Sequence, residues 1–170
     1  GKWLLEKVKE LNPKKILELG TANGYSGIIL SSGGAELTTI EIDRKIAEEA
    51  KSNFAKFNVD ARIIIGDAVE IIDKLEDKFD LIFIDFEKSK YIKILGSCVK
   101  ILNNDGCIIA DNIFFEGCKD YKKEVLSNKK FKTEIIYLKD GLSITRLTKF
   151  KIKKLRRGSL PFLFYFLFSF

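Results

Sequence analysis

The chain has 170 residues, of which 46% are hydrophobic and 32% charged, and this composition is typical of one globular domain with a substantial core. It contains no histidine, which excludes Ser-His-Asp and Cys-His catalysis and any zinc site with histidine ligands. The three cysteines are odd in number and lack the paired spacing of metal ligands, so we expect no structural disulfides and a reducing, cytoplasmic location.

The net charge of +6 comes from the C-terminal end of the chain. Residues 149–157 hold six lysines and arginines, and no acid occurs after residue 148. The preceding 148 residues therefore carry 24 basic and 24 acidic side chains. A neutral domain argues against a nucleic-acid-binding fold, although a local basic patch would still be compatible with one.

Apolar periodicity predicts alternating strands and helices along residues 1–148. The elements expected in chain order are a helix over 3–11, a strand over 15–19, a helix over 25–32, a strand over 37–42, a helix over 44–57 capped by Asp43, a strand over 61–65, a helix over 68–75, a strand over 79–84, a helix over 91–102, a turn over 103–106, a strand over 107–110, a helix over 121–126, and strands over 131–138 and 142–147.

The order of these elements predicts an α/β fold. Five strand–helix units favour a Rossmann-like, doubly wound sheet that is mostly parallel. The pair Asp140-Gly141 between the last two strands is typical of a hairpin turn. We therefore expect an antiparallel C-terminal hairpin with a reversed strand at the edge of the sheet.

A glycine-rich turn after the first strand is a candidate ligand site. Gly20 and Gly24 tolerate positive φ and would let the main chain approach a ligand closely. A tight strand-to-helix connection without a ligand is the alternative, because the glycine spacing is not the dinucleotide fingerprint. Glu18 before the turn, and Glu41 about 20 residues further on where an acid can accept hydrogen bonds from ribose, favour a cofactor site.

Acidic residues stand at the junctions after five successive strands, and ligands bind beyond the carboxyl ends of strands in doubly wound sheets. Any one of these acids is explained by helix capping, but five at consecutive junctions favour a site. They are Glu18, Glu41, Asp67, Asp85 and Asp111.

A smaller group of these residues has the chemistry of a metal site. Asp85, Asp111 and Asn112 offer only oxygen ligands, which suit a hard divalent cation, Mg²⁺ above all. Lys88, three residues after Asp85, is a solvated surface lysine by default, and its place beside the expected metal makes it a candidate base.

Seven stretches, matching in order and spacing, resemble the cation-dependent class I S-adenosylmethionine O-methyltransferases, the group of the catechol and caffeoyl-CoA O-methyltransferases and their bacterial relatives. The resemblance covers residues 1–148, and its most specific part is the combination of Gly24-Tyr25-Ser26 with Asp111-Asn112. The stretches are 16–26, 39–43, 66–68, 79–85, 88–91, 110–112 and 140–143.

The resemblance implies a cofactor site for S-adenosylmethionine. Its glycines would lie under the methionine part, with Tyr25 and Ser26 near the carboxylate; Glu41 would hold the ribose, and residues 67–68 would border the adenine. The residues assigned to this site are Glu18, Gly20, Gly24, Tyr25, Ser26, Glu41, Asp67, Ala68 and Asp85.

The resemblance also implies a metal and a base. Asp85, Asp111 and Asn112 would bind Mg²⁺ or another divalent cation, and Lys88 matches the lysine proposed as general base. The acceptor would be a small catechol-like molecule with adjacent oxygens. The alternatives are a hydroxylated tRNA uridine as acceptor, which some bacterial relatives methylate, and a non-catalytic cofactor-binding remnant.

Two features depart from the family. Members usually have some tens of residues of helix before the position of Trp3, so we expect residues 1–148 to be an N-terminally truncated methyltransferase domain, with consequences for the lid and for a possible homodimer. Phe86 stands where small residues are usual, and its ring could narrow the acceptor pocket or simply pack.

Residues 149–170 form a separate basic and aromatic tail that is unlike the family. A basic run followed by aromatic residues could bind an anionic membrane surface, although the apolar part is too short to span a bilayer. A partner-binding strand and translation from a shifted reading frame are the alternatives.

Overall fold

The computed structural model describes residues 1–148, so the expectations for the tail, membrane contact included, lie outside the described residues. The helical elements are α1 (Lys2–Leu11), α2 (Tyr25–Leu30), η1 (Ser31–Gly33), α3 (Arg44–Lys56), α4 (Ala68–Ile71), η2 (Ile72–Lys74), η3 (Lys88–Lys90), α5 (Tyr91–Ile101), η4 (Glu116–Cys118) and α6 (Lys119–Ser127). The strands are β1 (Lys15–Leu19), β2 (Glu36–Glu41), β3 (Ala61–Ile65), β4 (Phe79–Ile84), β5 (Leu102–Asp111), β6 (Phe131–Ile136) and β7 (Leu142–Leu147).

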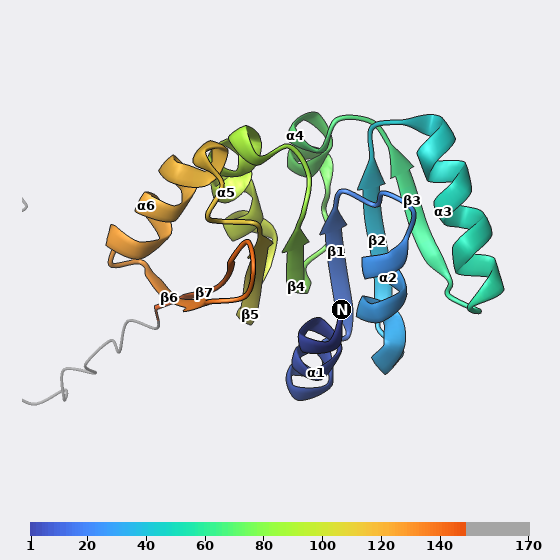
Figure 1. Ribbon diagram of the computed structural model, residues 1–170, viewed down its shortest axis with the longest axis horizontal. Coiled ribbons are helices and arrows are strands. Elements are labelled where there is room, and N and C mark those ends of the chain that lie inside the picture. The colour runs from blue at the N-terminus through green and yellow to red at the C-terminus, as the bar shows by residue number, and fades with distance from the viewer. Residues whose placement is uncertain (149–170) are drawn as a thin grey trace, which may run out of the picture.

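The strands form one seven-stranded sheet with the order β3-β2-β1-β4-β5-β7-β6 (Figure 1). β1 to β5 are parallel, and β7 pairs antiparallel with both β5 and β6. The expected doubly wound, mostly parallel sheet with a C-terminal hairpin is confirmed.

The reversed strand is not at the edge, so that part of the expectation is wrong. β7 lies inside the sheet, and β6 forms its edge. The burial of the two strands explains the order. The first four residues of β7 are buried, whereas β6 alternates between half-buried and exposed positions, as an edge strand does.

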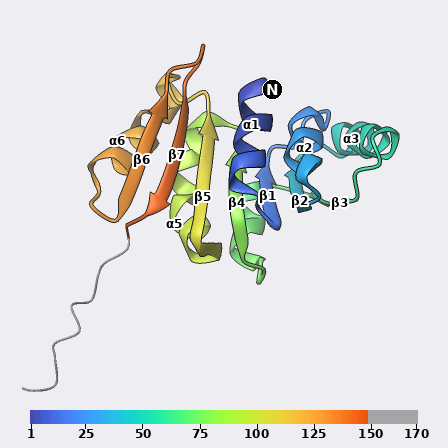
Figure 2. The same ribbon diagram turned by 90° about the horizontal axis from the view of Figure 1, so that it is seen from below.

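Helices cover both faces of the sheet and enclose two cores (Figure 2). One core joins the sheet to α1, α2 and α3 and includes Leu4, Leu30 and Phe54. The other joins it to α4, α5 and α6 and includes Ile72, Leu95 and Val125. β1 and β4 lie between the two cores, which explains why most of their residues are apolar.

Local signals in the sequence explain several element boundaries. Asp43 caps α3, since its carboxylate accepts hydrogen bonds from the backbone N–H of Lys45 at 2.7 Å and of Ile46 at 3.2 Å. Asn12 ends α1 in the left-handed conformation, with φ +45°, just before Pro13.

The segment 103–106, expected as a turn, belongs to β5 as an irregularity. Phe79 pairs with Leu102 and Leu81 with Cys107, so four residues of β5 lie opposite Asp80 alone. The side-chain amide of Asn103 donates a hydrogen bond to the Asp80 carboxylate at 2.7 Å and holds the irregularity against β4.

No helix in the described part of the chain is both long enough and apolar enough to cross a bilayer. Each of the three cysteines, Cys98, Cys107 and Cys118, is unpaired and buried.

Candidate functional site

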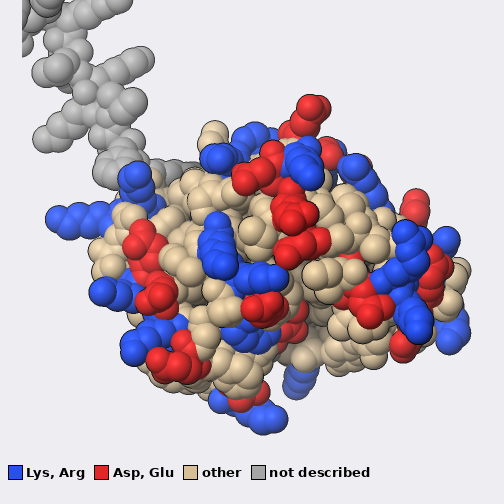
Figure 3. Space-filling model, turned by 90° about the horizontal axis from the view of Figure 1, so that it is seen from above, with Lys and Arg blue, Asp and Glu red and all other residues tan. Residues whose placement is uncertain are grey.

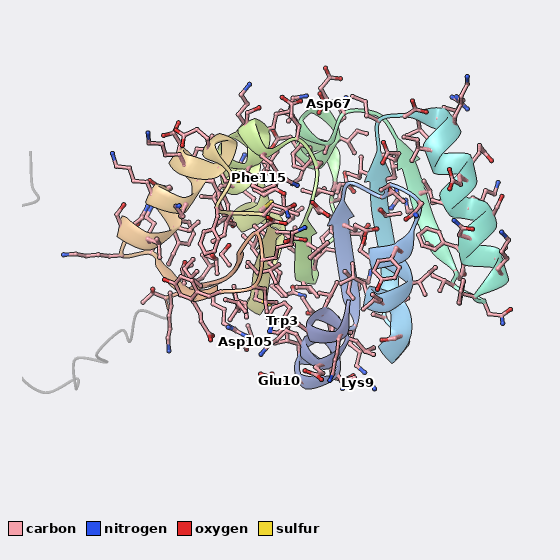
Figure 4. The ribbon with its side chains drawn as sticks, viewed as in Figure 1. Trp3, Lys9, Glu10, Asp67, Asp105 and Phe115 are labelled. Carbon is pink, nitrogen blue, oxygen red and sulfur yellow. The ribbon has the colours of Figure 1, made fainter. Side chains whose placement is uncertain are left out.

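Two cavities lie at the carboxyl ends of the parallel strands. The first, of about 330 Å³, is called the Glu41 cavity here, and its walls include Gly20, Glu41, Asp67 and Ala68. Figure 4 labels Asp67 at this edge of the sheet, beside α4. The predicted ribose and adenine residues are therefore brought together around one cavity.

The second, the Asp111 cavity, has a volume of about 260 Å³. It is lined by Tyr25 and Ser26 of the glycine-rich turn, by Asp85 and Asp111, and by apolar side chains that include Trp3 of α1. Leu138 and Leu142 close it on the hairpin side. The two cavities share Ala22 and Asp85 in their walls, so Asp85 lies where they meet.

The glycines of the turn are required by the fold as well as by any ligand. Gly20 has φ +102°, and a Cβ at this position would lie 2.1 Å from the carbonyl oxygen of Asp85. Gly24 has φ +86°, and its Cβ would lie 3.0 Å from the ring of Phe54. The turn thus packs directly against the end of β4 on one side and against α3 on the other.

Glu18 is fully buried beneath this turn. One carboxylate oxygen accepts a hydrogen bond from the Ser26 hydroxyl and the other from the Thr39 hydroxyl, both at 2.6 Å. Burial raises the pKa of Glu18 to about 7, and the two hydroxyls only partly oppose that shift. Glu18 therefore supports the turn from below, and it does not line either cavity.

The raised pKa of Glu18 predicts a pH dependence of stability. Between its ordinary pKa of 4.5 and about 7, the folded protein keeps a proton that the unfolded chain has lost, so the free energy of unfolding falls as pH rises through this window. The loss should approach about 3 kcal/mol above pH 7. Glu18→Gln should remove this component, which urea denaturation of both proteins at pH 5 and pH 8 would measure. An equal pH dependence in the two proteins would contradict the assignment.

Glu41 and Asp67 are each anchored by backbone groups. Glu41 accepts hydrogen bonds from the N–H of Ala22 at 2.9 Å and of Asp43 at 3.0 Å, and its oxygens keep further lone pairs for ligand hydroxyls. Asp67 caps α4 through Val69 N–H at 2.9 Å, and that bond, together with an ion pair to Lys90 at 3.0 Å, lowers its pKa. Sequence reasoning missed Lys90, which lines the Glu41 cavity.

Asp85 and Asp111 form an acid pair in the wall of the Asp111 cavity. Asp85 accepts a hydrogen bond from Lys88 Nζ at 2.6 Å, and Asp111 accepts one from the backbone N–H of Asn112 at 2.7 Å. Burial raises the pKa of Asp111, and the negative charge of Asp85 raises it further. The predicted base and two predicted metal ligands are therefore neighbours.

The donor set of this pair fits a divalent cation. The charge of Asp85 raises the pKa of Asp111, so a cation bound to both side chains would stabilise the ionised form of Asp111, and oxygen ligands suit Mg²⁺. Asn112 adopts φ +56° directly after Asp111 and lies beyond the residues that line the cavity. Within residues 1–148, no three histidine, cysteine or acidic side chains gather as a metal cluster, so the predicted set of three ligands depends on the Asn112 amide.

Tyr91 is a site residue that sequence reasoning missed. Its buried hydroxyl accepts a hydrogen bond from Lys88 Nζ at 3.1 Å and lies 3.1 Å and 3.2 Å from the carbonyl oxygens of Ile84 and Asp111. It therefore joins the ends of β4 and β5 to the lysine. Its sequence signals are its place at the end of the matching stretch 88–91 and its position three residues after Lys88, one turn along the helical segment, but no role was assigned to it.

If Lys88 is the base that the resemblance implies, Tyr91→Phe should lower kcat about tenfold and leave KM for the acceptor unchanged, because Lys88 loses one of the two oxygens that orient its amine. Steady-state kinetics would measure the split. Tyr121→Phe is the matched control, since this ring packs edge-on against Tyr91 at 5.7 Å and its loss of a hydroxyl should leave kcat unchanged. Equal losses in both variants would indicate a packing effect only.

Phe86 contributes to the Glu41 cavity and is absent from the walls of the Asp111 cavity. Its ring stacks on Tyr91 with a centroid distance of 5.6 Å and an interplanar angle of 23°. Of the two expectations, packing is therefore the one that the structure supports. Phe86 narrows the space beside the predicted adenine residues rather than the space beside the acid pair.

A larger cavity, of about 370 Å³, lies at the opposite, amino-terminal edge of the parallel strands. Lys15 in its wall pairs with Asp77 at 3.1 Å and with Glu36 at 3.6 Å, and Arg62 pairs with Asp77 at 3.5 Å. Four of the charged side chains in its wall are thus paired with one another, as is common for exposed ion pairs at a protein surface.

Comparison with known proteins agrees with this geometry. A family model described as O-methyltransferase matches residues 1–148. Catechol O-methyltransferase B of Danio rerio is 31% identical over an alignment of 152 residues, and the match covers 82% of this chain and 56% of that protein. The catechol O-methyltransferase of Niastella koreensis is 32% identical over 126 residues, 69% of this chain and 57% of that protein. The chain thus spans about half the length of the curated relatives that it matches.

A solved structure shares the fold. The O-methyltransferase from Bacillus cereus in complex with SAH superposes with a TM-score of 0.81 at 23% identity, covering 86% of this chain and 80% of that one. The family match spans the whole sheet and both cavities. The chain therefore belongs to the O-methyltransferase family.

Proposed function

We propose that the chain is an S-adenosylmethionine-dependent and divalent-metal-dependent O-methyltransferase for a small, catechol-like acceptor. The observation that carries the proposal is the meeting of the two cavities at Asp85. A cofactor with its nucleoside in the Glu41 cavity would place its amino-acid end beside Tyr25 and Ser26, on one side of the Asp111 cavity, and the acceptor would lie beside Asp111 in the rest of that cavity. Family membership and the SAH-bound relative support the choice of cofactor.

The chain's own residues supply binding and orientation. Glu41 would accept hydrogen bonds from the ribose hydroxyls, residues 67–68 would border the adenine, and the glycine-rich turn would hold the amino-acid end. When bound, S-adenosylmethionine supplies an electrophilic methyl group. The apolar walls of the Asp111 cavity exclude water from the acceptor hydroxyl, which favours transfer to that oxygen.

Lys88 would move the proton that the acceptor hydroxyl must lose. Its Nζ is oriented by Asp85 and by the Tyr91 hydroxyl, and after releasing its own proton to solvent it would accept the hydroxyl proton. Asp85, Asp111 and Asn112 would hold the divalent cation. When bound, that cation polarises adjacent acceptor oxygens and makes the hydroxyl easier to deprotonate.

Surface charge favours a small acceptor over tRNA. Figure 3 shows the face seen from above in Figure 1, toward which the parallel strands point, and basic and acidic side chains are interspersed over its described residues. A nucleic acid is typically bound by a continuous basic surface. Intact Asp85, Asp111 and Lys88 argue in the same way against a non-catalytic remnant.

The direct test uses the full chain. Calorimetry should detect binding of SAH, and a methyl-transfer assay with catechol should give activity with Mg²⁺ that EDTA abolishes. Glu41→Gln should weaken SAH binding roughly tenfold or more, because hydrogen bonds to a charged group are lost. Glu49→Gln, an exposed acid on α3, is the matched control and should bind SAH normally.

The possible results separate the alternatives. SAH binding without transfer to any catechol, but with transfer to a hydroxyuridine-containing tRNA, would replace the acceptor. Transfer that continues in EDTA would overturn the metal requirement. Absence of SAH binding would favour the non-catalytic reading.

A further inference from the structure

In the polar network beneath the glycine-rich turn, the acceptor of each hydroxyl hydrogen can be assigned. Thr39 donates its hydroxyl hydrogen to one oxygen of Glu18, and Thr21, 2.6 Å from Thr39, therefore donates to Thr39. Ser26 donates its hydroxyl hydrogen to the other Glu18 oxygen at 2.6 Å. Each hydroxyl has a single hydrogen, so all three are committed when Glu18 is ionised.

This commitment limits what Ser26 can offer to a ligand. Ser26 lines the Asp111 cavity, where its oxygen presents only lone pairs while its hydrogen points to Glu18. An anionic group on a ligand needs a donor, and lone pairs repel it. If Glu18 carries a proton, its own O–H can donate to Ser26, and the Ser26 hydrogen becomes free for the ligand.

The surroundings of Glu18 favour uptake of a proton. Glu18 is 0% exposed, and the two charged groups that act on it are both acids, Glu41 at the end of β2 and Asp85 after β4. The flanking helices contribute uncharged groups, Ser26 and Gly27 from α2 and the ring of Phe54 from α3. An additional anionic group beside Ser26 would add a third negative charge to this environment.

We propose that Glu18 is a positioning residue that takes up one proton when the carboxylate of the cofactor's amino-acid end binds beside Ser26. The inference rests on the proposed function, since it requires a cofactor with an amino-acid end at the turn. A new O–H bond forms on Glu18 with a proton from the buffer, and it donates to the Ser26 oxygen. The Ser26 hydroxyl turns to donate to the ligand carboxylate, and no other bond changes.

The raised pKa of Glu18, about 7, makes this step measurable. At pH 8 most of the unliganded protein holds Glu18 ionised, so binding should take up about one proton. Calorimetric titration of the full chain with SAH, in buffers that differ in ionisation enthalpy, gives this number as the slope of the observed enthalpy. Titration with 5′-methylthioadenosine, which lacks the amino-acid end, should give a slope near zero.

Variants identify the group that receives the proton. Glu18→Gln should bind SAH with no proton uptake, and Ser26→Ala, which removes the linking hydroxyl, should also lose the uptake. Asp111→Asn is the matched control, because Asp111 is another site acid with a raised pKa and its replacement should leave the uptake intact. If Glu18→Gln does not fold, Ser26→Ala still decides the outcome.

The failures are distinguishable. SAH binding by the wild-type chain with a slope of zero would overturn the inference and leave the proposed function standing, since Ser26 would then face the ligand ammonium. Uptake that persists in Glu18→Gln, or that disappears in Asp111→Asn, would assign the proton to another group. Absence of SAH binding would overturn the proposed function and this inference together.

Discussion

Asp111→Asn should lower the rate of methyl transfer about 10³-fold and leave SAH binding unchanged. The substitution keeps the side chain's shape and an oxygen that can accept the Asn112 N–H, but it removes one of the two negative charges of the acid pair. Loss of a cation that polarises the acceptor costs several kcal/mol of transition-state stabilisation, and about 4 kcal/mol corresponds to that factor. Single-turnover kinetics and SAH calorimetry would measure the two effects separately.

Asp120→Asn is the matched control for this substitution. Asp120, exposed on α6, carries the same charge away from both cavities, so Asp120→Asn should transfer methyl groups at the wild-type rate. A wild-type rate in Asp111→Asn would overturn its role as a metal ligand. A loss of SAH binding in that variant would instead indicate that the cofactor site depends on this side chain.

Gly20→Ala should destabilise the fold by at least about 3 kcal/mol. The new Cβ would lie 2.1 Å from a backbone oxygen, that of Asp85, so no side-chain rotation can relieve the clash, and φ +102° adds strain for any residue with a Cβ. The apparent melting temperature should fall by about 10 °C, which thermal unfolding of the two proteins would measure.

Gly96→Ala, the same chemical change at another position, is expected to raise stability instead of lowering it. Gly96 lies exposed in α5, and a Cβ there would meet no atom within 4 Å. Alanine should raise stability by about 0.5–1 kcal/mol, because glycine in a helix interior has the larger conformational entropy to lose. A stable Gly20→Ala protein would show that the end of β4 can move away from the turn.

Most of the fold could be predicted because the apolar runs in the sequence coincide with the segments that are buried in the folded chain. β1, β3, β4 and β7 begin and end where their apolar runs do. The place of β7 inside the sheet was missed, since hairpin signals specify which strands pair and not which of them faces the rest of the sheet. The irregularity at 103–106 was missed because its anchor, Asp80, lies on another strand.

Site residues could be predicted where they belong to a sequence motif. They could not be predicted where their role comes from contacts that form only in the folded chain. Glu41, Asp67 and Asp85 were found from their positions after strands, and all three line one cavity. Tyr91 was missed because its hydroxyl acquires its role from carbonyl groups at the ends of β4 and β5. The ligands and proton movements assigned to these residues remain predictions that the experiments above test.

The β6–β7 hairpin, which closes the Asp111 cavity, is also hydrogen-bonded to the residues that follow Asp111. The N–H groups of Ile113 and Phe114, just after Asp111 and Asn112, donate to carbonyl oxygens of the turn at Gly141 and Asp140, both at 3.1 Å. Insertions in this turn would therefore displace Asp111, whereas side-chain replacements at positions such as Leu138 would not. Related enzymes are expected to diverge in acceptor preference by substitution at constant loop length, whereas the Glu41 cavity, which no residue of this hairpin lines, is expected to vary less.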